Sequence, residues 1–166
     1  MKNRCGKRFT QAVANMYVNT EYIPKEKNRL GKGISTAYGV TQGRRSSTGF
    51  YSFYVSDMPK AVQENASGED FMDPHNIAQL VDDSALYADS ITSIDNKFQS
   101  VIQYSRRKGQ VINIKKTVYL HFSDNPISKT LYMNQYESIQ AVQKNESHRY
   151  LGMMFFPCKT INEIVI

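Results

Sequence analysis

Residues 76–89 read NIAQLVDDSALYAD, and this stretch decides the fold. Two arms of apolar or small residues flank a pair of aspartates, which predicts a β-hairpin with Asp82 and Asp83 at its two-residue centre. Asp-Asp is not one of the usual hairpin turns, and adjacent carboxylates repel each other. A tight hairpin would place the two side chains on opposite faces, where they do not easily share one ion. Because the pair breaks a local rule, a metal site is considered beside the simpler solvated turn.

The segment after this hairpin predicts the clearest helix of the chain, at residues 93–108. Ser93 is placed to cap its start, and Gly109 suits the position just past its end. The buried face of this helix is expected to consist of Ile94, Phe98, Val101 and Ile102.

Before the hairpin, the apolar spacing predicts one helix over residues 7–19 and two shorter helical pieces over residues 46–64. The first of these pieces has Phe50, Phe53 and Tyr54 on one side, and Asp57 is placed to cap the second. The first helix has an apolar stripe of Phe9, Ala12, Val13, Met16 and Tyr17.

The remaining segments predict short strands and loops. Residues 20–36 are polar and favour an exposed connection with a short strand, and residues 65–75 favour a loop. Strands are expected where β-branched and aromatic residues cluster, at 110–114, 118–122, 136–142 and 149–156. The predicted fold class is therefore α+β, with a small antiparallel sheet and helices packed on one face.

Charge is unevenly distributed along the 166 residues, whose formal net charge is +6. Residues 1–45 are strongly basic, residues 61–96 carry only acidic charges, and residues 97–123 carry only basic ones. This pattern suits a protein that holds phosphate backbones and also a cation, although a solvated basic face explains it equally well.

Several classes of protein are disfavoured. No apolar run approaches the ~20 residues of a membrane helix, and no apolar segment follows the basic N-terminus as in a signal peptide. Cys5 and Cys158 lie far apart, which favours a reduced, intracellular setting, nuclear or cytoplasmic. The sequence contains no zinc-type spacing, no phosphate-binding P-loop and no G-x-S-x-G nucleophile motif.

Four blocks occur in a set order around the Asp pair. Residues 39–47 read GVTQGRRSS and are followed by a helical segment that ends in VSDMP at residues 55–59. Next come LVDD at 80–83, GQVINIKKT at 109–117 and RYLG at 149–152. Blocks of this kind in this order resemble the palm of reverse transcriptases, specifically those of non-LTR (LINE-like) retroelements.

The resemblance implies a role for particular residues. Asp82 and Asp83 would be ligands of catalytic Mg²⁺ (or Mn²⁺), and Lys116 would stabilise charge near the pyrophosphate leaving group. Residues beside the nucleotide and template would be Gly39, Gln42, Gly43 and Ser47. The primer grip would comprise Tyr150, Leu151 and Gly152. Each also has a simpler alternative as a turn, a solvated lysine or a core residue.

One expected element is missing from the resemblance. In the family, the first catalytic carboxylate lies on a strand well upstream of the GxxQG block, and the only acids before Gly39 are Glu21 and Glu26. Residues 1–166 are thus expected to be a single partial reverse-transcriptase domain, with palm motifs at 39–122 and the end of the palm and primer grip at 123–166.

Two functional hypotheses follow. The parent enzyme would copy RNA into DNA, with an RNA template, a DNA primer and deoxynucleotides as partners and no membrane. The isolated chain is expected to be a truncated, catalytically inactive fragment, acting at most as a nucleic-acid-binding or interaction module that associates with the missing palm and fingers segment.

Overall fold

The computed structural model describes residues 6–18, 20–35, 39–41, 43–64, 77–122, 130–143, 146–157 and 163–165. The chain divides into two compact units, Met1–Ser47 and Thr48–Ile166. The loop predicted at 65–75 lies outside the described residues.

The first unit consists of a helix and a narrow antiparallel ribbon. Helix α1 (Lys7–Tyr17) is two residues shorter than predicted, and none of its residues is buried. Residues 20–36 contain more structure than the single strand expected there. β1 (Glu21–Tyr22) pairs with β4 (Ile34–Ser35), and β2 (Lys25–Glu26) pairs with β3 (Arg29–Leu30).

The second unit begins with two short helices, as predicted for residues 46–64. They are α2 (Ser47–Tyr54) and α3 (Met58–Gln63). The face of α2 that contacts the core differs from the prediction, because Phe53 and Tyr54 are exposed while Tyr51 packs against the core. Val55, one helical turn after Tyr51, is fully buried. The core-facing side of this segment is therefore the one that carries Tyr51 and Val55.

Helix α4 (Ile91–Lys108) is the longest element and ends where the sequence predicts. Its cap is Ser90 rather than Ser93, since the Ser90 hydroxyl oxygen accepts a 3.2 Å hydrogen bond from the Ser93 amide. Gly109 adopts a φ of 66°, the left-handed conformation predicted for the residue after the helix. Ile94, Phe98 and Ile102 are buried as expected, and Val101 is partly buried.

A four-stranded sheet forms the centre of the second unit, in the order β5-β6-β12-β7. Every neighbouring pair is antiparallel. Its strands are β5 (Ile77–Leu80), β6 (Asp83–Ala88), β7 (Tyr119–Leu120) and β12 (Glu163–Val165). The prediction of a strand at 110–114 is wrong, because these residues form a loop and a turn. The strand predicted at 118–122 is present but is limited to the two residues of β7.

Two further hairpins lie outside this sheet. β8 (Thr130–Tyr132) pairs with β9 (Ser138–Gln140), so the strand predicted at 136–142 is present but shorter. β10 (His148–Tyr150) pairs with β11 (Met153–Phe155). The single strand predicted at 149–156 is therefore a hairpin that turns at residues 151–152.

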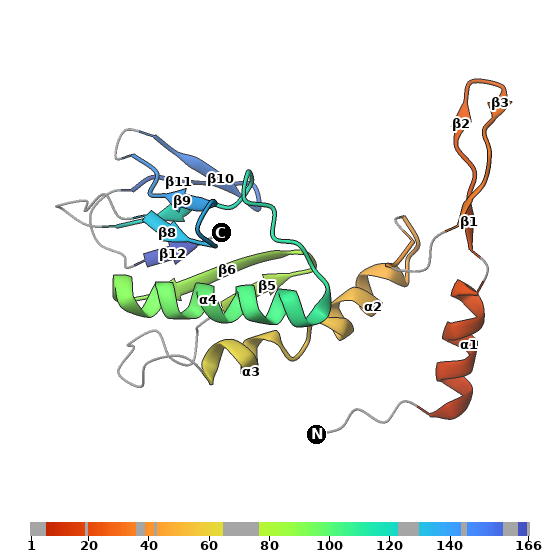
Figure 1. The fold of residues 1–166 in the computed structure, drawn as a ribbon, viewed down its shortest axis with the longest axis horizontal. Coiled ribbons are helices and arrows are strands. Elements are labelled where there is room, and N and C mark those ends of the chain that lie inside the picture. The colour runs from red at the N-terminus through yellow and green to blue at the C-terminus, as the bar shows by residue number, and fades with distance from the viewer. Residues whose placement is uncertain are drawn as a thin grey trace. The chain divides into compact units, whose positions relative to one another are not determined.

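The helices cover one face of the sheet, as predicted, and the fold is mixed α+β. Helix α4 packs against β6 and β12, and α3 packs against α4 (Figure 1). Leu86 and Ala88 of β6 face this core. Ala85 points to the other side and belongs to a second, smaller apolar cluster. Both faces of β6 are thus covered near its middle, while its first residue, Asp83, stays exposed.

Candidate active site

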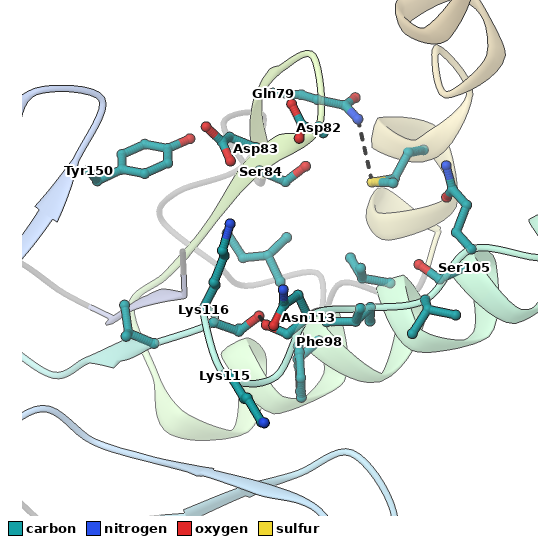
Figure 2. Close-up of a pocket in the computed structure, with 18 of the residues that line it drawn as sticks. Gln79, Asp82, Asp83, Ser84, Phe98, Ser105, Asn113, Lys115, Lys116 and Tyr150 are labelled. Carbon is teal, nitrogen blue, oxygen red and sulfur yellow. Dashed lines mark hydrogen bonds between the residues drawn. The ribbon is translucent and has the colours of Figure 1, made fainter. Parts of the chain in front are cut away.

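A cleft of about 770 Å³ lies beside the β5–β6 hairpin of the second unit. Its walls come from α2, α3, α4, the hairpin, the loop that follows α4, and the β10 hairpin (Figure 2). Carboxylates, amines, amides and phenols all reach this one space. The cleft therefore offers both charges that binding a metal-bound phosphate requires.

The hairpin turn differs by one residue from the prediction. Leu80 pairs with Asp83, so the two turn residues are Val81 and Asp82, and Asp83 is the first residue of β6. Val81 has a φ of 57°. Positive φ is rare for a β-branched residue and stores strain of about 1–3 kcal/mol, which typically persists at functional sites.

Both aspartates are exposed and both line the cleft. Asp82 projects from the turn and Asp83 from the strand beside it (Figure 2). Asp83 is directed toward Tyr150 and Asp82 toward Gln79, so the two carboxylates reach the cleft on different sides of the hairpin (Figure 2).

A local turn presents Lys116 to the same cleft. The Asn113 carbonyl oxygen accepts hydrogen bonds from the amides of Lys116 and Thr117 and from the Thr117 hydroxyl, each 3.0 Å long. These bonds close residues 113–117 into one compact turn. The Lys116 amine extends toward the hairpin, whereas the Lys115 amine points away from it (Figure 2).

The β10–β11 hairpin brings the third predicted group. Tyr150 and Leu151 line the cleft, and Gly152 follows them in the turn. Leu151 and Gly152 have φ angles of 47° and 86°. A glycine in the second position makes this turn accessible without a side-chain clash. The Tyr150 pKa is raised by burial of the phenol, with smaller contributions from Tyr87 and Asp83.

Two cleft residues were not predicted from the sequence. Tyr51 of α2 accepts a 3.1 Å hydrogen bond from the side-chain amide of Gln110. Burial raises the Tyr51 pKa first, and the negative charge of Asp82 raises it further, which places this phenol within electrostatic range of the turn. No sequence signal distinguishes Tyr51, because Phe50, Phe53 and Tyr54 form an equally good helical stripe.

The predicted nucleotide and template residues lie elsewhere in the chain. Gly39, Gly43 and Ser47 belong to the first unit, with φ angles of 95° and 85° at the two glycines. The Ser47 hydroxyl donates a hydrogen bond to the Thr41 carbonyl, so this serine holds its own loop. Gln42 lies outside the described residues.

The donor set of the cleft fits a divalent cation. Two neighbouring carboxylates at a solvent-accessible turn, with room for waters and phosphate oxygens, match the oxygen-rich surroundings that Mg²⁺ prefers. Within the described ranges, no three His, Cys, Asp or Glu side chains come together as a metal-binding group. Asp82 and Asp83 are thus the carboxylates that these ranges place at the cleft.

No helix in the described part of the chain is long and apolar enough to span a bilayer. Nothing among the curated proteins or the solved structures matches the sequence. The family model of the reverse transcriptase (RNA-dependent DNA polymerase) domain matches residues 3–155, which is most of the chain. A nucleic-acid template and nucleotide substrates are the partners that this family implies. The match covers all four sequence blocks and every residue that lines the cleft, and the chain belongs to the reverse transcriptase family.

Proposed function

We propose that this chain provides the metal-binding hairpin, the leaving-group lysine and the primer-end turn of an enzyme that copies RNA into DNA. The observation that carries the proposal is the strained β5–β6 turn, which holds Asp82 and Asp83 over a cleft that Lys116 enters from the other side (Figure 2). Opposite charges facing one another across a solvent-filled space suit a nucleoside triphosphate with its bound cation.

Each group has a distinct task in this proposal. Asp82 and Asp83 would hold Mg²⁺, or Mn²⁺, and the bound ions supply charge stabilisation to the transferring phosphoryl group. Lys116 binds the two outer phosphates and stabilises the charge that develops on the leaving pyrophosphate. Leu151 and Gly152 position the primer end, where their tight turn brings backbone close to the substrate.

Further components complete the site. Two-metal catalysis needs another carboxylate, and we propose that another part of the palm supplies it. Gly39, Gln42, Gly43 and Ser47 are proposed to contact the nucleotide and template. The order of the four blocks favours a LINE-like, non-LTR element as the origin of the chain, with residues 1–166 as one partial domain.

A second candidate function is a nucleic-acid-binding module without catalysis. It is favoured by the absence of a group of three metal-binding side chains within the described residues. In this case the basic side chains bind phosphates, and the Asp pair has no catalytic task.

A ternary-complex assay separates the two functions without requiring turnover. Binding of the chain to a recessed DNA primer on an RNA template is measured by fluorescence anisotropy, with Mg²⁺ and either the matched or a mismatched deoxynucleotide. The proposed function predicts that the matched nucleotide tightens binding on the order of tenfold, and that Asp82→Asn removes this gain.

Equal affinity with matched and mismatched nucleotides would favour the binding module instead. Primer extension under the same conditions adds a second readout. Extension that disappears in Asp82→Asn would overturn the module hypothesis outright.

A further inference from the structure

One face of β6 links the catalytic hairpin to the β10–β11 hairpin. Asp83, Ala85 and Tyr87 alternate along β6, so their side chains share one face of the sheet. This is the face opposite α4, since Leu86 and Ala88 point toward the helical core. Asp83 therefore shares this face with Ala85 and Tyr87, which belong to the smaller apolar cluster around Ala85 and Leu120.

Tyr150 of β10 packs against this face of β6. Its ring packs against the cluster of Ala85 and Leu120, beside Tyr87. Its hydroxyl is directed toward the Asp83 carboxylate (Figure 2). Ala85 is fully buried, and its small side chain leaves space for the Tyr150 ring on this face of β6. This packing holds the Tyr150 ring in place, and its hydroxyl is thereby directed toward the Asp83 carboxylate.

The electrostatic surroundings agree with this geometry. The Tyr150 pKa is raised by burial, then by Tyr87, then by the charge of Asp83. A tyrosine phenol is protonated at neutral pH and can donate a hydrogen bond. A carboxylate is its strongest available acceptor, because hydrogen bonds to charged groups are stronger than neutral ones.

We propose that Tyr150 is a positioning residue that holds the Asp83 carboxylate and thereby fixes the β10–β11 hairpin relative to the catalytic hairpin. A carboxylate has two acceptor oxygens, so Asp83 can accept from Tyr150 and still share the cation with Asp82. The contact then sets the distance between the cation site and the primer-end turn at Leu151–Gly152. This inference rests on the proposed function for its purpose, but the contact itself is independent of it.

The contact is tested by NMR of the full chain labelled with [¹³Cζ]-tyrosine. Tyr150→Phe identifies the Tyr150 signal by removing it, and it keeps the ring that packs on Ala85. Asp83→Asn is expected to shift the Tyr150 signal, whereas the matched neighbour change Asp82→Asn leaves it in place. No shift in Asp83→Asn, or an equal shift in both variants, would overturn the proposal.

A binding measurement tests the consequence. Tyr150→Phe is expected to weaken binding of a recessed primer–template by several-fold to tenfold. Combining it with Asp83→Asn should cost no more than the larger single loss. Independent, multiplied losses would show that the two residues do not act together. Tyr132→Phe, an exposed tyrosine of β8, is the control.

The two proposals fail separately. A Tyr150 shift that depends on Asp83 in a chain without matched-nucleotide enhancement would support the contact and contradict the function. Matched-nucleotide enhancement in a chain whose Tyr150 signal does not respond to Asp83→Asn would support the function and contradict the contact.

Discussion

Val81 is the residue at which local preference and function conflict most directly. A β-branched side chain at a φ of 57° is disfavoured, yet the position lies immediately before Asp82. The antiparallel pairing of Leu80 with Asp83 forces a two-residue turn here. The strain is therefore maintained by the ladder on both sides, and the turn keeps Asp82 projecting into the cleft.

Replacement of Val81 tests this strain. Val81→Gly is expected to be about 1 kcal/mol more stable than Val81→Ala, because only glycine adopts positive φ without a steric penalty. Urea unfolding of the two variants measures the difference. Equal stabilities, or a more stable alanine variant, would mean that the turn is not strained at this residue.

Lys116 and Lys115 form a matched pair for testing charge in the cleft. Both are exposed and adjacent in sequence, but only Lys116 extends toward the Asp hairpin (Figure 2). Lys116→Ala should weaken matched-nucleotide binding in the ternary complex on the order of tenfold, whereas Lys115→Ala should change it less than about twofold. Comparable losses in both variants would indicate general attraction of phosphate rather than a directed contact.

At the scale of elements, α3 and α4 are joined by a polar cluster around Asp57. Asp57 occupies the cap position of α3, but its side chain makes no capping hydrogen bond. Its carboxylate instead accepts from the Tyr104 hydroxyl and pairs with Lys108 at 3.2 Å. The prediction that Asp57 caps α3 through its side chain is therefore wrong, because the carboxylate interacts with Tyr104 and Lys108 of α4 instead of the α3 amides.

This cluster predicts an acid-sensitive contribution to stability. The hydrogen bond from Tyr104, and then the bond and charge of Lys108, lower the pKa of Asp57 against the opposing effect of burial. A lowered pKa stabilises the fold above the unfolded value of about 3.9 and loses that contribution as the pH falls below it. The stability difference between the unmodified chain and Asp57→Asn should thus be present at pH 7 and shrink near pH 3.

Urea unfolding at the two pH values measures this difference. Glu64→Gln is the control, because Glu64 makes only an exposed ion pair with Lys60 at 3.8 Å. A difference for Asp57→Asn that does not depend on pH would contradict the assignment.

The helices were predictable because their signals are local. Apolar spacing and Gly109 predict a helix that begins two residues later than α4 does and ends at the same residue. The strand at 110–114 failed because the Asn113 carbonyl is taken by amides three and four residues later, which closes a turn. β12 has no local signal, since its three residues depend on pairing with β6 and β7.

The same distinction applies to the site. Asp82, Asp83, Lys116, Tyr150 and Leu151 could be predicted because they occur in ordered sequence blocks, and the fold brings all five to one cleft. Tyr51 and Gln110 could not, because their hydrogen bond joins residues 59 positions apart. The proposed contact of Tyr150 with Asp83 likewise depends on which face of β6 carries Asp83 and Ala85.

At the scale of the whole molecule, the basic side chains of the first unit predict salt-dependent binding. The β2–β3 ribbon exposes Lys25, Lys27 and Arg29. If each contacts a phosphate, replacing all three with glutamine should reduce the slope of log affinity against log salt by about 2–3. Filter binding to an RNA–DNA duplex measures the slope. Lys60→Gln is the control, and a slope near zero in the unmodified chain would contradict phosphate contact altogether.

We propose the Asp82–Asp83 turn as the divalent-cation site of this reverse-transcriptase chain. Paramagnetic broadening of backbone amide NMR signals by Mn²⁺ tests it most directly, because broadening locates the bound ion without requiring catalysis. The amide signals of Asp82, Asp83 and Ser84 are expected to broaden first, and Asp82→Asn is expected to abolish this effect. Strongest broadening away from the β5–β6 hairpin, or broadening unchanged in Asp82→Asn, would contradict it.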